Sequence, residues 1–218
     1  MSLPLQSILS AVDHTALSRT ATKEDIERLV TEANLVHAAS VCVPPSYVSL
    51  ARTLVRDGVR VCTVIGFPNG YNTTAVKVYE TLDAIKNGAD EIDMVINTNL
   101  VKEGNYAAVT EEIRALKEAC GDKVLKVIVE ACLLTEEEKV AMCEAVTKAG
   151  ADYIKTSTGF EKSGATIDDV ALFRRTVGKG VKVKAAGGIR SIESAEAFLE
   201  AGADRIGASA VIKEYLKK

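Results

Sequence analysis

The sequence predicts one α/β domain, a closed (β/α)8 TIM barrel, and three observations carry this prediction. Apolar runs rich in β-branched residues recur about every 28 residues, with helix-like segments between them. One Gly-Ala-Asp phrase occurs three times, which indicates a repeated helix-then-strand unit. The length of 218 residues suits a single large core. We therefore expect one barrel over residues 1–218, with no linker and no second domain.

Eight apolar runs are the expected strands. Their alternation with helix-like segments favours a parallel sheet, and eight units at this spacing favour closure into a barrel. An open doubly wound sheet is the alternative that the pattern alone leaves open. The runs centre near Val12, Val41, Val64, Val95, Val127, Ile154, Val183 and Ile206.

The repeated phrase and the helix-start signals mark the joints between elements. Segments 87–94, 149–156 and 201–208 each read as a helix end with a glycine, a tight turn and then a buried strand. Residues 135–138, Thr-Glu-Glu-Glu, fit a capping box at the start of a helix. Residues 22–25 and 166–169 are weaker versions of the same signal.

Composition argues against several classes of function. The net charge is −3 and no basic block stands out, so we expect no nucleic-acid partner. No apolar stretch reaches the roughly 18 residues of a membrane span. The first six residues lack the charged and apolar regions of a secretory signal. We expect a protein of the cytoplasm that acts on a small molecule.

Cysteine and histidine usage bears on metals and redox state. The five cysteines are scattered and form no Cys-x-x-Cys pair, which is typical of reduced thiols in a cytoplasmic protein. The two histidines, His14 and His37, offer no ligand cluster with the spacing of a catalytic zinc site. We therefore expect no metal in the chemistry of this protein.

Polar residues within the apolar runs are the candidate functional residues. In a TIM barrel the chemistry lies at the carboxyl ends of the strands, so we searched there. The search returns Asp13, Asp93, Asn97, Lys126, Glu130, Lys155, Thr156, Thr158 and Lys184.

Two lysines inside apolar strands are the strongest anomaly. Lys155 and Lys184 lie on neighbouring predicted strands, and lysines are rarely buried without a reason. Each could simply extend its head to water or pair with a carboxylate at the barrel mouth. However, burial and a second ammonium group both lower the pKa of a lysine. A neutral amine is what attack on a carbonyl requires, so the pair indicates a nucleophile.

Three further charged residues have two readings each. Asp93 either pairs with a lysine for stability alone or belongs to a proton relay with it, and the sequence leaves both open. Lys126 and Glu130 are four apart on one strand and therefore share a face. We expect them to form a structural charge pair in the lower barrel interior, in preference to a direct catalytic part.

Glycines after the last two strands indicate a phosphate site. Gly187 and Gly188 follow the seventh strand, and segment 207–209, Gly-Ala-Ser, follows the eighth. Barrels often bind phosphate with these two loops, and glycine lets backbone N–H groups approach the anion closely. A single Gly-Gly often marks only a turn, but the paired placement favours a phosphorylated ligand.

These motifs resemble those of the deoxyribose-phosphate aldolase family, in order and over nearly the whole chain. The Lys-Thr-Ser-Thr-Gly motif together with Lys-x-Ala-Gly-Gly is the most specific part of the resemblance. The matching segments are 12–15, 41–44, 65–68, 91–97, 155–159, 184–190 and 207–209.

The resemblance implies a class I aldolase that needs no cofactor. It would reversibly split 2-deoxy-D-ribose 5-phosphate into D-glyceraldehyde 3-phosphate and acetaldehyde, as a step of deoxyribonucleotide catabolism. Lys155 would form the Schiff base, Lys184 would keep it neutral and share in proton transfer, and Asp93 would complete the relay. We also expect a homo-oligomer. Positions lining the substrate site would be Asp13, Cys42 and Thr158, and those of the phosphate site Gly159, Gly187, Gly188, Gly207 and Ser209.

Two positions depart from the family pattern, and two other functions compete. Ala210 stands where many members have serine, and Phe160 stands where some have lysine, so both changes could weaken phosphate binding. A sugar-phosphate epimerase on the same barrel would leave the lysine pair unexplained. A non-catalytic sugar-phosphate binding protein would not need Lys155 or Asp93, and both are present.

Overall fold

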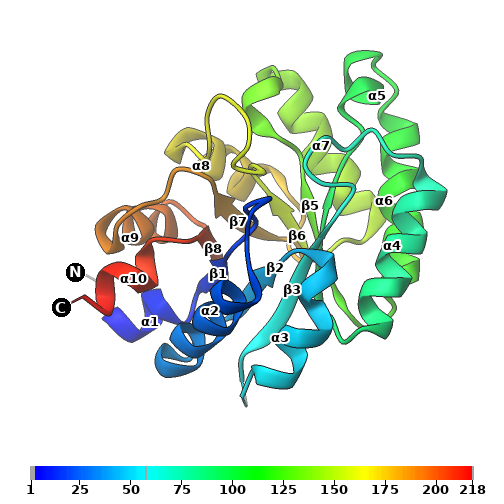
Figure 1. Ribbon diagram of the computed structural model, residues 1–218. Helices are drawn as coiled ribbons and strands as arrows, with labels where there is room; N and C mark the ends of the chain where they lie inside the picture. The colour runs from blue at the N-terminus through cyan, green and yellow to red at the C-terminus, as the bar shows by residue number, and fades with distance from the viewer. Residues whose placement is uncertain (1–2, 57, 218) are drawn as a thin grey trace.

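The computed structural model describes residues 3–56 and 58–217. Eight parallel strands close into a barrel in the order of the chain, β1 to β8 (Figure 1). The predicted fold is confirmed, the open sheet is excluded, and every predicted run centre lies within a strand. Residues 1–2, 57 and 218 of the predicted domain, with the start of the segment read for a secretory signal, lie outside the described residues. The strands are β1 (Val12–Thr15), β2 (Ser40–Val43), β3 (Arg60–Ile65), β4 (Glu91–Val95), β5 (Val124–Ile128), β6 (Tyr153–Lys155), β7 (Lys182–Ala186) and β8 (Arg205–Ala208).

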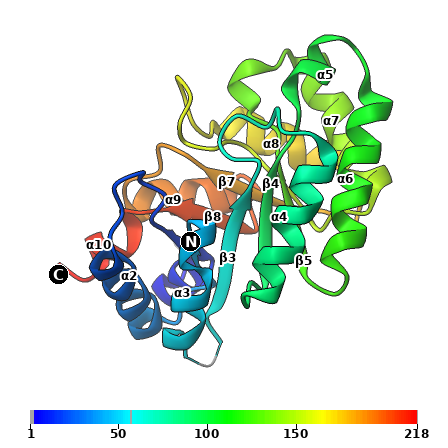
Figure 2. The ribbon, with the colours of Figure 1, turned by 45° about the vertical axis from the view of Figure 1, so that its right-hand side comes forward.

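Helices surround the barrel on its outside, as the two ribbon views show (Figures 1 and 2). A search of the described residues finds no helix with the length and hydrophobicity needed to cross a membrane. The helices are α1 (Leu5–Leu9), α2 (Lys23–Val36), α3 (Val48–Leu54), α4 (Thr74–Lys86), α5 (Thr98–Lys102), α6 (Tyr106–Cys120), α7 (Glu136–Ala149), α8 (Ile167–Thr176), α9 (Ile192–Glu200) and α10 (Val211–Tyr215), with 3-10 turns η1 (Pro45–Tyr47) and η2 (Ala131–Leu133).

The helix-start signals are confirmed, with one difference. Thr135 and Thr22 each cap a helix reciprocally with the acidic residue three positions later. Thr166 caps α8 by accepting from the backbone N–H of Asp169. The Asp169 carboxylate accepts from Lys139 of α7 at 2.6 Å, so this end of α8 is tied to its neighbouring helix.

The three Gly-Ala-Asp joints fold alike. Gly88, Gly150 and Gly202 have φ angles of 106°, 75° and 110°, in the left-handed region that favours glycine. Each ends a helix and leads after a short turn into β4, β6 or β8. The predicted unit of helix end, turn and buried strand is therefore confirmed at all three places.

The aspartate of each of the three joints makes the same two contacts. Its carboxylate accepts a backbone N–H near the start of the preceding strand, at 2.8–2.9 Å. It also pairs with a cation from the preceding helix layer, at 2.7–3.0 Å. The joint therefore fastens the amino end of one strand to the next and to the helices outside. The three pairs are Arg52 with Asp90, Lys117 with Asp152, and Arg174 with Asp204.

A fourth joint of the same shape precedes β2, although its sequence lacks the Gly-Ala-Asp phrase. His37 ends α2 with a left-handed φ of 52°, where the other joints have glycine. The following residue, Ala38, donates its N–H to a carbonyl five residues earlier, as Ala89, Ala151 and Ala203 do. An exposed histidine tolerates this backbone conformation better than most residues, which explains the substitution.

The molecule has two interiors of opposite character. Between the strands and the helices lies a continuous apolar core of valine, isoleucine, leucine and alanine. Inside the barrel, by contrast, fully buried charged side chains meet one another. Register places Lys155 of β6 beside Lys184 of β7, and Asp93 of β4 beside Lys126 of β5. The polar interior is where the candidate functional residues converge.

Candidate active site

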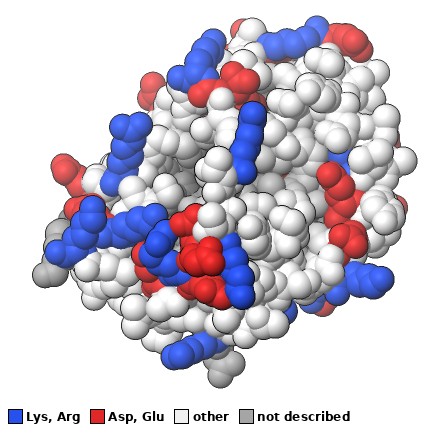
Figure 3. Space-filling view, in the orientation of Figure 1, with Lys and Arg blue, Asp and Glu red and all other residues white. Residues whose placement is uncertain are grey.

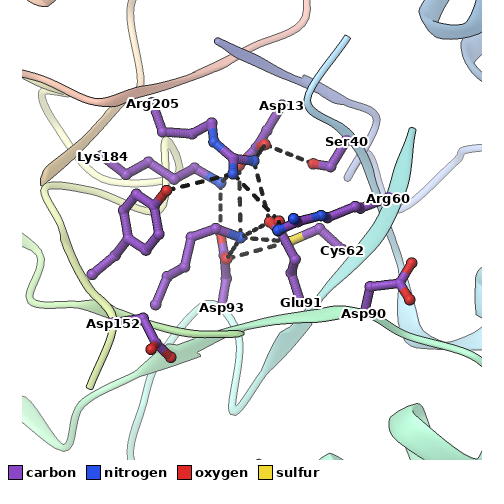
Figure 4. Close-up of polar contacts among 12 residues, drawn as sticks. Asp13, Ser40, Arg60, Cys62, Asp90, Glu91, Asp93, Asp152, Lys184 and Arg205 are labelled. Carbon is purple, nitrogen blue, oxygen red and sulfur yellow. Dashed lines mark hydrogen bonds and ion pairs between the residues drawn. The ribbon is translucent and has the colours of Figure 1, made fainter. Parts of the chain in front are cut away.

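Asp93 is the centre of the charged cluster. One carboxylate oxygen, Oδ2, accepts from the Nζ of Lys155 at 2.8 Å and from the Nζ of Lys184 at 2.7 Å. The other, Oδ1, accepts from Lys126 at 2.9 Å. The predicted proximity of the two strand lysines to each other and to Asp93 is confirmed. One carboxylate thus joins both lysines of the predicted relay, as Figure 4 shows for Lys184.

Asp13 holds the other side of Lys184. Its Oδ2 accepts from Lys184, and its Oδ1 accepts from Ser40 and from Arg205, both at 2.6 Å (Figure 4). Burial raises the pKa of Asp13, but Lys184, Arg205 and Lys126 outweigh it, so this pKa lies below its ordinary value. Asp13 is therefore a carboxylate, and it anchors Lys184 from below.

The lower interior is a second ion network, and one expectation about it is wrong. Lys126 pairs with Glu91 at 2.5 Å as well as with Asp93, so Glu130 is not its partner. Glu130 lies beyond the end of β5 with a left-handed φ of 51°, which breaks the alternation that would have placed both on one face. Its carboxylate instead accepts the backbone N–H of Thr158 at 3.2 Å, and also the Thr158 hydroxyl.

Carboxylates in this interior hold two of its lysines as cations. Three carboxylates meet four basic side chains, and Arg60, which also contacts Glu91, keeps its own side chain largely in solvent. Burial lowers the pKa of Lys184, but Asp13 and Asp93 raise it further, so the net shift is upward. For Lys126 burial is likewise outweighed, chiefly by Asp93, so its pKa also lies above the ordinary value. Lys155 forms an ion pair with Asp93 at 2.8 Å. The carboxylates are Asp13, Glu91 and Asp93, and the basic side chains are Lys126, Lys155, Lys184 and Arg205.

A cleft of about 500 Å³ opens above the cluster at the carboxyl ends of the strands. Lys155 reaches its floor. Asp13 and Cys42 are not among its lining residues, because both are buried inside the barrel below it. The cleft thus brings together most of the predicted substrate and phosphate positions. Those that line it are Thr158, Gly159, Gly187, Gly188, Gly207 and Ser209.

Close backbone packing shapes the part of the cleft lined by the loops after β6 and β7. Gly187 and Gly188 have φ angles of 85° and 79°, so both use glycine's freedom. A Cβ at Gly164 would lie 2.2 Å from the carbonyl oxygen of Gly187, and one at Gly207 would lie 3.1 Å from Cε of Lys184. Glycine at these positions lets the loop after β6 meet the loop after β7, and lets Lys184 cross the barrel.

The two departures from the family pattern both lie in the cleft wall. Phe160 lines the cleft and is supported from behind by Phe67, which it meets edge-to-face with ring centroids 5.2 Å apart. Ala210 also lines the cleft, together with two cations, Arg190 and Lys213. Figure 3 shows the surface hollowed near the middle of the view, with charged side chains gathered beside it over α2 and α10.

Sequence reasoning missed several members of the site. Glu91 and Arg205 were outside the search, because they begin their strands and only the carboxyl ends were inspected. A search for charged residues anywhere in the apolar runs would have found them. Cys62, whose Sγ lies 3.2 Å from Oδ1 of Asp93, gave no such signal, since cysteine is common in cores.

A buried lysine at the floor of a cleft, with a second lysine and a shared carboxylate, is the arrangement expected for an aldolase, a lyase of carbon–carbon bonds, and the comparisons with known proteins show this class. The chain belongs to the DeoC/LacD family of aldolases, whose sequence profile matches residues 7–213. It is 54% identical over 209 residues to a deoxyribose-phosphate aldolase of Clostridioides difficile, covering 96% of this chain and 95% of that protein. A Streptococcus pyogenes protein of the same name is 55% identical over 211 residues, covering 97% of this chain and 95% of its own.

Solved structures agree with this assignment. A putative deoxyribose-phosphate aldolase from Coccidioides immitis superimposes with a TM-score of 0.94 at 42% identity, covering 99% of this chain and 88% of that one. The deoxyribose phosphate aldolase of Aeropyrum pernix, described as a tetramer, superimposes with a TM-score of 0.86 at 34% identity, covering 98% and 92%. The resemblance seen in the motifs is therefore confirmed over the fold as a whole.

Proposed function

We propose that the protein is a Schiff-base aldolase that reversibly cleaves 2-deoxy-D-ribose 5-phosphate to D-glyceraldehyde 3-phosphate and acetaldehyde. The observation that carries the proposal is Lys155 at the floor of the cleft, 2.8 Å from a carboxylate that also holds Lys184. The names of the curated relatives support this substrate. Deoxyribonucleotide catabolism is the role that follows from it.

The first stage forms the imine. The neutral Nζ of Lys155 attacks C1 of the open-chain sugar, and the carbonyl oxygen takes a proton to give a carbinolamine. Loss of water then leaves an iminium ion. Lys184 is the nearby acid that protonates this oxygen in both steps, because Asp13 and Asp93 keep it an ammonium group. Asp93, bonded to both lysines, provides the path for the proton between them.

The second stage breaks the C2–C3 bond. A base removes the proton of the C3 hydroxyl, the C2–C3 electrons move into the iminium ion, and glyceraldehyde 3-phosphate leaves. The resulting enamine takes a proton at C2 and becomes the imine of acetaldehyde. Water hydrolyses this imine and frees Lys155. The relay of Lys184 and Asp93 supplies and removes these protons, so every step uses side chains already in contact.

The phosphate would bind where the loops after β6, β7 and β8 meet at the cleft, with Gly159 packed against Gly187. Gly187 and Gly188 present backbone there, and Ser209 follows β8 at the same edge. Arg190 and Lys213 add positive charge to this wall, which compensates for the aromatic residue at position 160. Asp13 and Cys42 would act from beneath the substrate, Asp13 through Lys184.

Assembly into a homo-oligomer is also proposed. Four large apolar side chains on and before α4 are exposed, which is typical of an interface, and a second copy of this chain is the occupant we favour. The tetramer described for the Aeropyrum pernix protein supports this choice. Light scattering after size-exclusion chromatography, with Tyr79→Glu as the disrupting variant, tests it. The four residues are Tyr71, Val76, Tyr79 and Leu82.

Borohydride trapping tests the proposed chemistry. The protein is incubated with acetaldehyde, reduced, digested and mapped, and one two-carbon unit is expected on Lys155. A label on Lys184 instead would exchange the two roles. A companion assay follows cleavage of 2-deoxyribose 5-phosphate in buffer with EDTA, where the expectation of no metal and no cofactor predicts full activity. Fractionation of the native host tests the expected place in the cytoplasm.

A further inference from the structure

Two cysteines face each other inside the barrel. Cys42 of β2 and Cys62 of β3 are partners in the strand register. Adjacent strands lie about 4.8 Å apart, and side chains that point to the concave face of a barrel converge further. Both thiols are buried and form a small cluster with Val64, which Leu17 and Phe67 cover. Leu17 also lines the cleft, so the thiols lie one layer below it.

A carboxylate completes this pair. The Sγ of Cys62 lies 3.2 Å from Oδ1 of Asp93 (Figure 4). The two sulfurs and a carboxylate oxygen are all within 4.8 Å of one another. Ligands around a tetrahedral zinc ion, with Zn–S near 2.3 Å, are separated by roughly 3.8 Å. Small side-chain rotations are enough to reach that spacing.

We propose that Cys42, Cys62 and Asp93 form a binding site for a thiophilic divalent cation such as Zn²⁺ or Cd²⁺. Two thiolates and one carboxylate, with a water molecule as fourth ligand, are a donor set that such ions prefer. The proposed catalysis shares Asp93 with this site, but its chemistry runs through Lys155 and requires no metal.

The charge of the interior allows such an ion despite three neighbouring lysines. When the ion binds, each thiol loses its proton to solvent, so two protons leave and one divalent cation enters. The net charge of the cluster does not change. The metal itself displaces both thiol protons, because a thiolate is the form that binds it.

Occupation of the site should inhibit the enzyme. Oδ1 of Asp93 now accepts from Lys126 and contacts Cys62, while Oδ2 holds Lys155 and Lys184. A cation on Oδ1 competes with these lysines for the same carboxylate. The proton relay then loses the group that joins its two lysines, so inhibition follows from the position of Asp93 and is reversed when a chelator removes the ion.

The binding test is a titration of the reduced protein with CdCl₂. Cadmium–thiolate bonds absorb in the ultraviolet, and this band reports binding without reference to activity. We expect the band to saturate at one ion per chain, and to vanish in Cys42→Ala and in Cys62→Ala. Cys132→Ala is the matched control, because Cys132 is more exposed than the other four cysteines and is a competing surface thiol. Circular dichroism checks that each variant is folded.

The inhibition test rests on the proposed function, and its result is evaluated separately from the cadmium absorbance. Activity toward 2-deoxyribose 5-phosphate should fall to baseline as the band saturates and should return with EDTA. The proposal is overturned if the parent shows no band, or if the band survives in both alanine variants or is lost with Cys132. A parent that binds cadmium but never cleaves the sugar would refute the proposed function and leave the metal site standing.

Discussion

Two lysines on neighbouring strands share Asp93 and yet belong to different environments. Lys126 lies in the lower interior, has no solvent access and contacts three carboxylates. Lys155 lies at the mouth of the barrel, lines the cleft and, among the described residues, forms an ion pair with one carboxylate, Asp93. The comparison indicates that several carboxylates fix the lower lysine in place, whereas the proposed nucleophile is held by a single carboxylate and faces the cleft.

The largest effect should come from removing the amine at the mouth. Lys155→Met should abolish cleavage and borohydride trapping, because no other amine reaches the cleft floor in the same geometry. The free energy of unfolding should change little, since Asp93 keeps two other cations. The assay is trapping followed by mass spectrometry. Residual trapping at Lys184 in this variant would show that the environments are less distinct than their contacts indicate.

Removing the lower lysine should instead affect stability. Lys126→Met leaves Glu91 and Asp93 short of a buried partner, which costs about 3–5 kcal/mol in comparable cases. Urea unfolding measures this loss, and trapping on the folded fraction should persist. If Lys126→Met unfolds at the same urea concentration as Lys155→Met, the lower network contributes less to stability than its geometry implies.

Acid should lower the free energy of unfolding, because it protonates the buried carboxylates that pair with the lysines. The pKa values of Asp13 and Asp93 lie below the usual value near 3.9 in the folded protein, because the cations outweigh burial. Below about pH 4 the unfolded chain therefore binds more protons than the folded one, and stability falls as pH falls. Urea midpoints between neutral and acid pH measure the effect. A flat profile through this range would contradict the paired state of these carboxylates.

A smaller effect, on the rate of imine formation, is expected from Lys184→Leu. It removes the like charge beside Lys155 and frees Asp93 and Asp13 to stabilise an ammonium ion there. Imine formation should slow at neutral pH and recover at higher pH. Lys182→Leu is the control, because it removes an exposed lysine from the same strand. If the pH profiles of Lys184→Leu and the parent coincide, the repulsion argument fails and Lys184 serves proton transfer alone.

The smallest effect concerns the phosphate. Ser209→Asp places a carboxylate beside the expected dianion, so KM should rise for 2-deoxyribose 5-phosphate and much less for 2-deoxyribose. Ser209→Ala keeps the backbone N–H and adds no charge, so its KM should stay near that of the parent. An equal loss for both sugars would place the phosphate elsewhere in the cleft.

The strands and the proximity of three site residues could be predicted because local patterns determine them. Lys155, Lys184 and Asp93 each stand out in an apolar run, and alternation along a parallel barrel brings such residues inside. Hydrogen bonds of 2.7–2.8 Å from the two lysines to Asp93 then become possible when the sheet closes. The glycines of the proposed phosphate site do line the cleft, and their role stays a prediction.

What could not be predicted depends on partners far apart in the chain or on one backbone angle. Arg205 meets Asp13 across 192 positions, which no local pattern indicates. Glu130 left the predicted charge pair because its left-handed backbone turns it toward Thr158. The position of Asp13 below the cleft depends on the stagger of β1 against β8, which the sequence does not reveal.

The joints before β2, β4, β6 and β8 separate the stability of the barrel from its chemistry. They share the same alanine hydrogen bond, and three share the glycine, the aspartate and its cationic partner. His37 keeps the left-handed backbone angle without glycine, so the angle is what the joint requires. Because these joints lie at the amino ends of the strands, opposite the cleft, the loops at the carboxyl ends can differ in sequence without loosening the joints that hold the barrel closed.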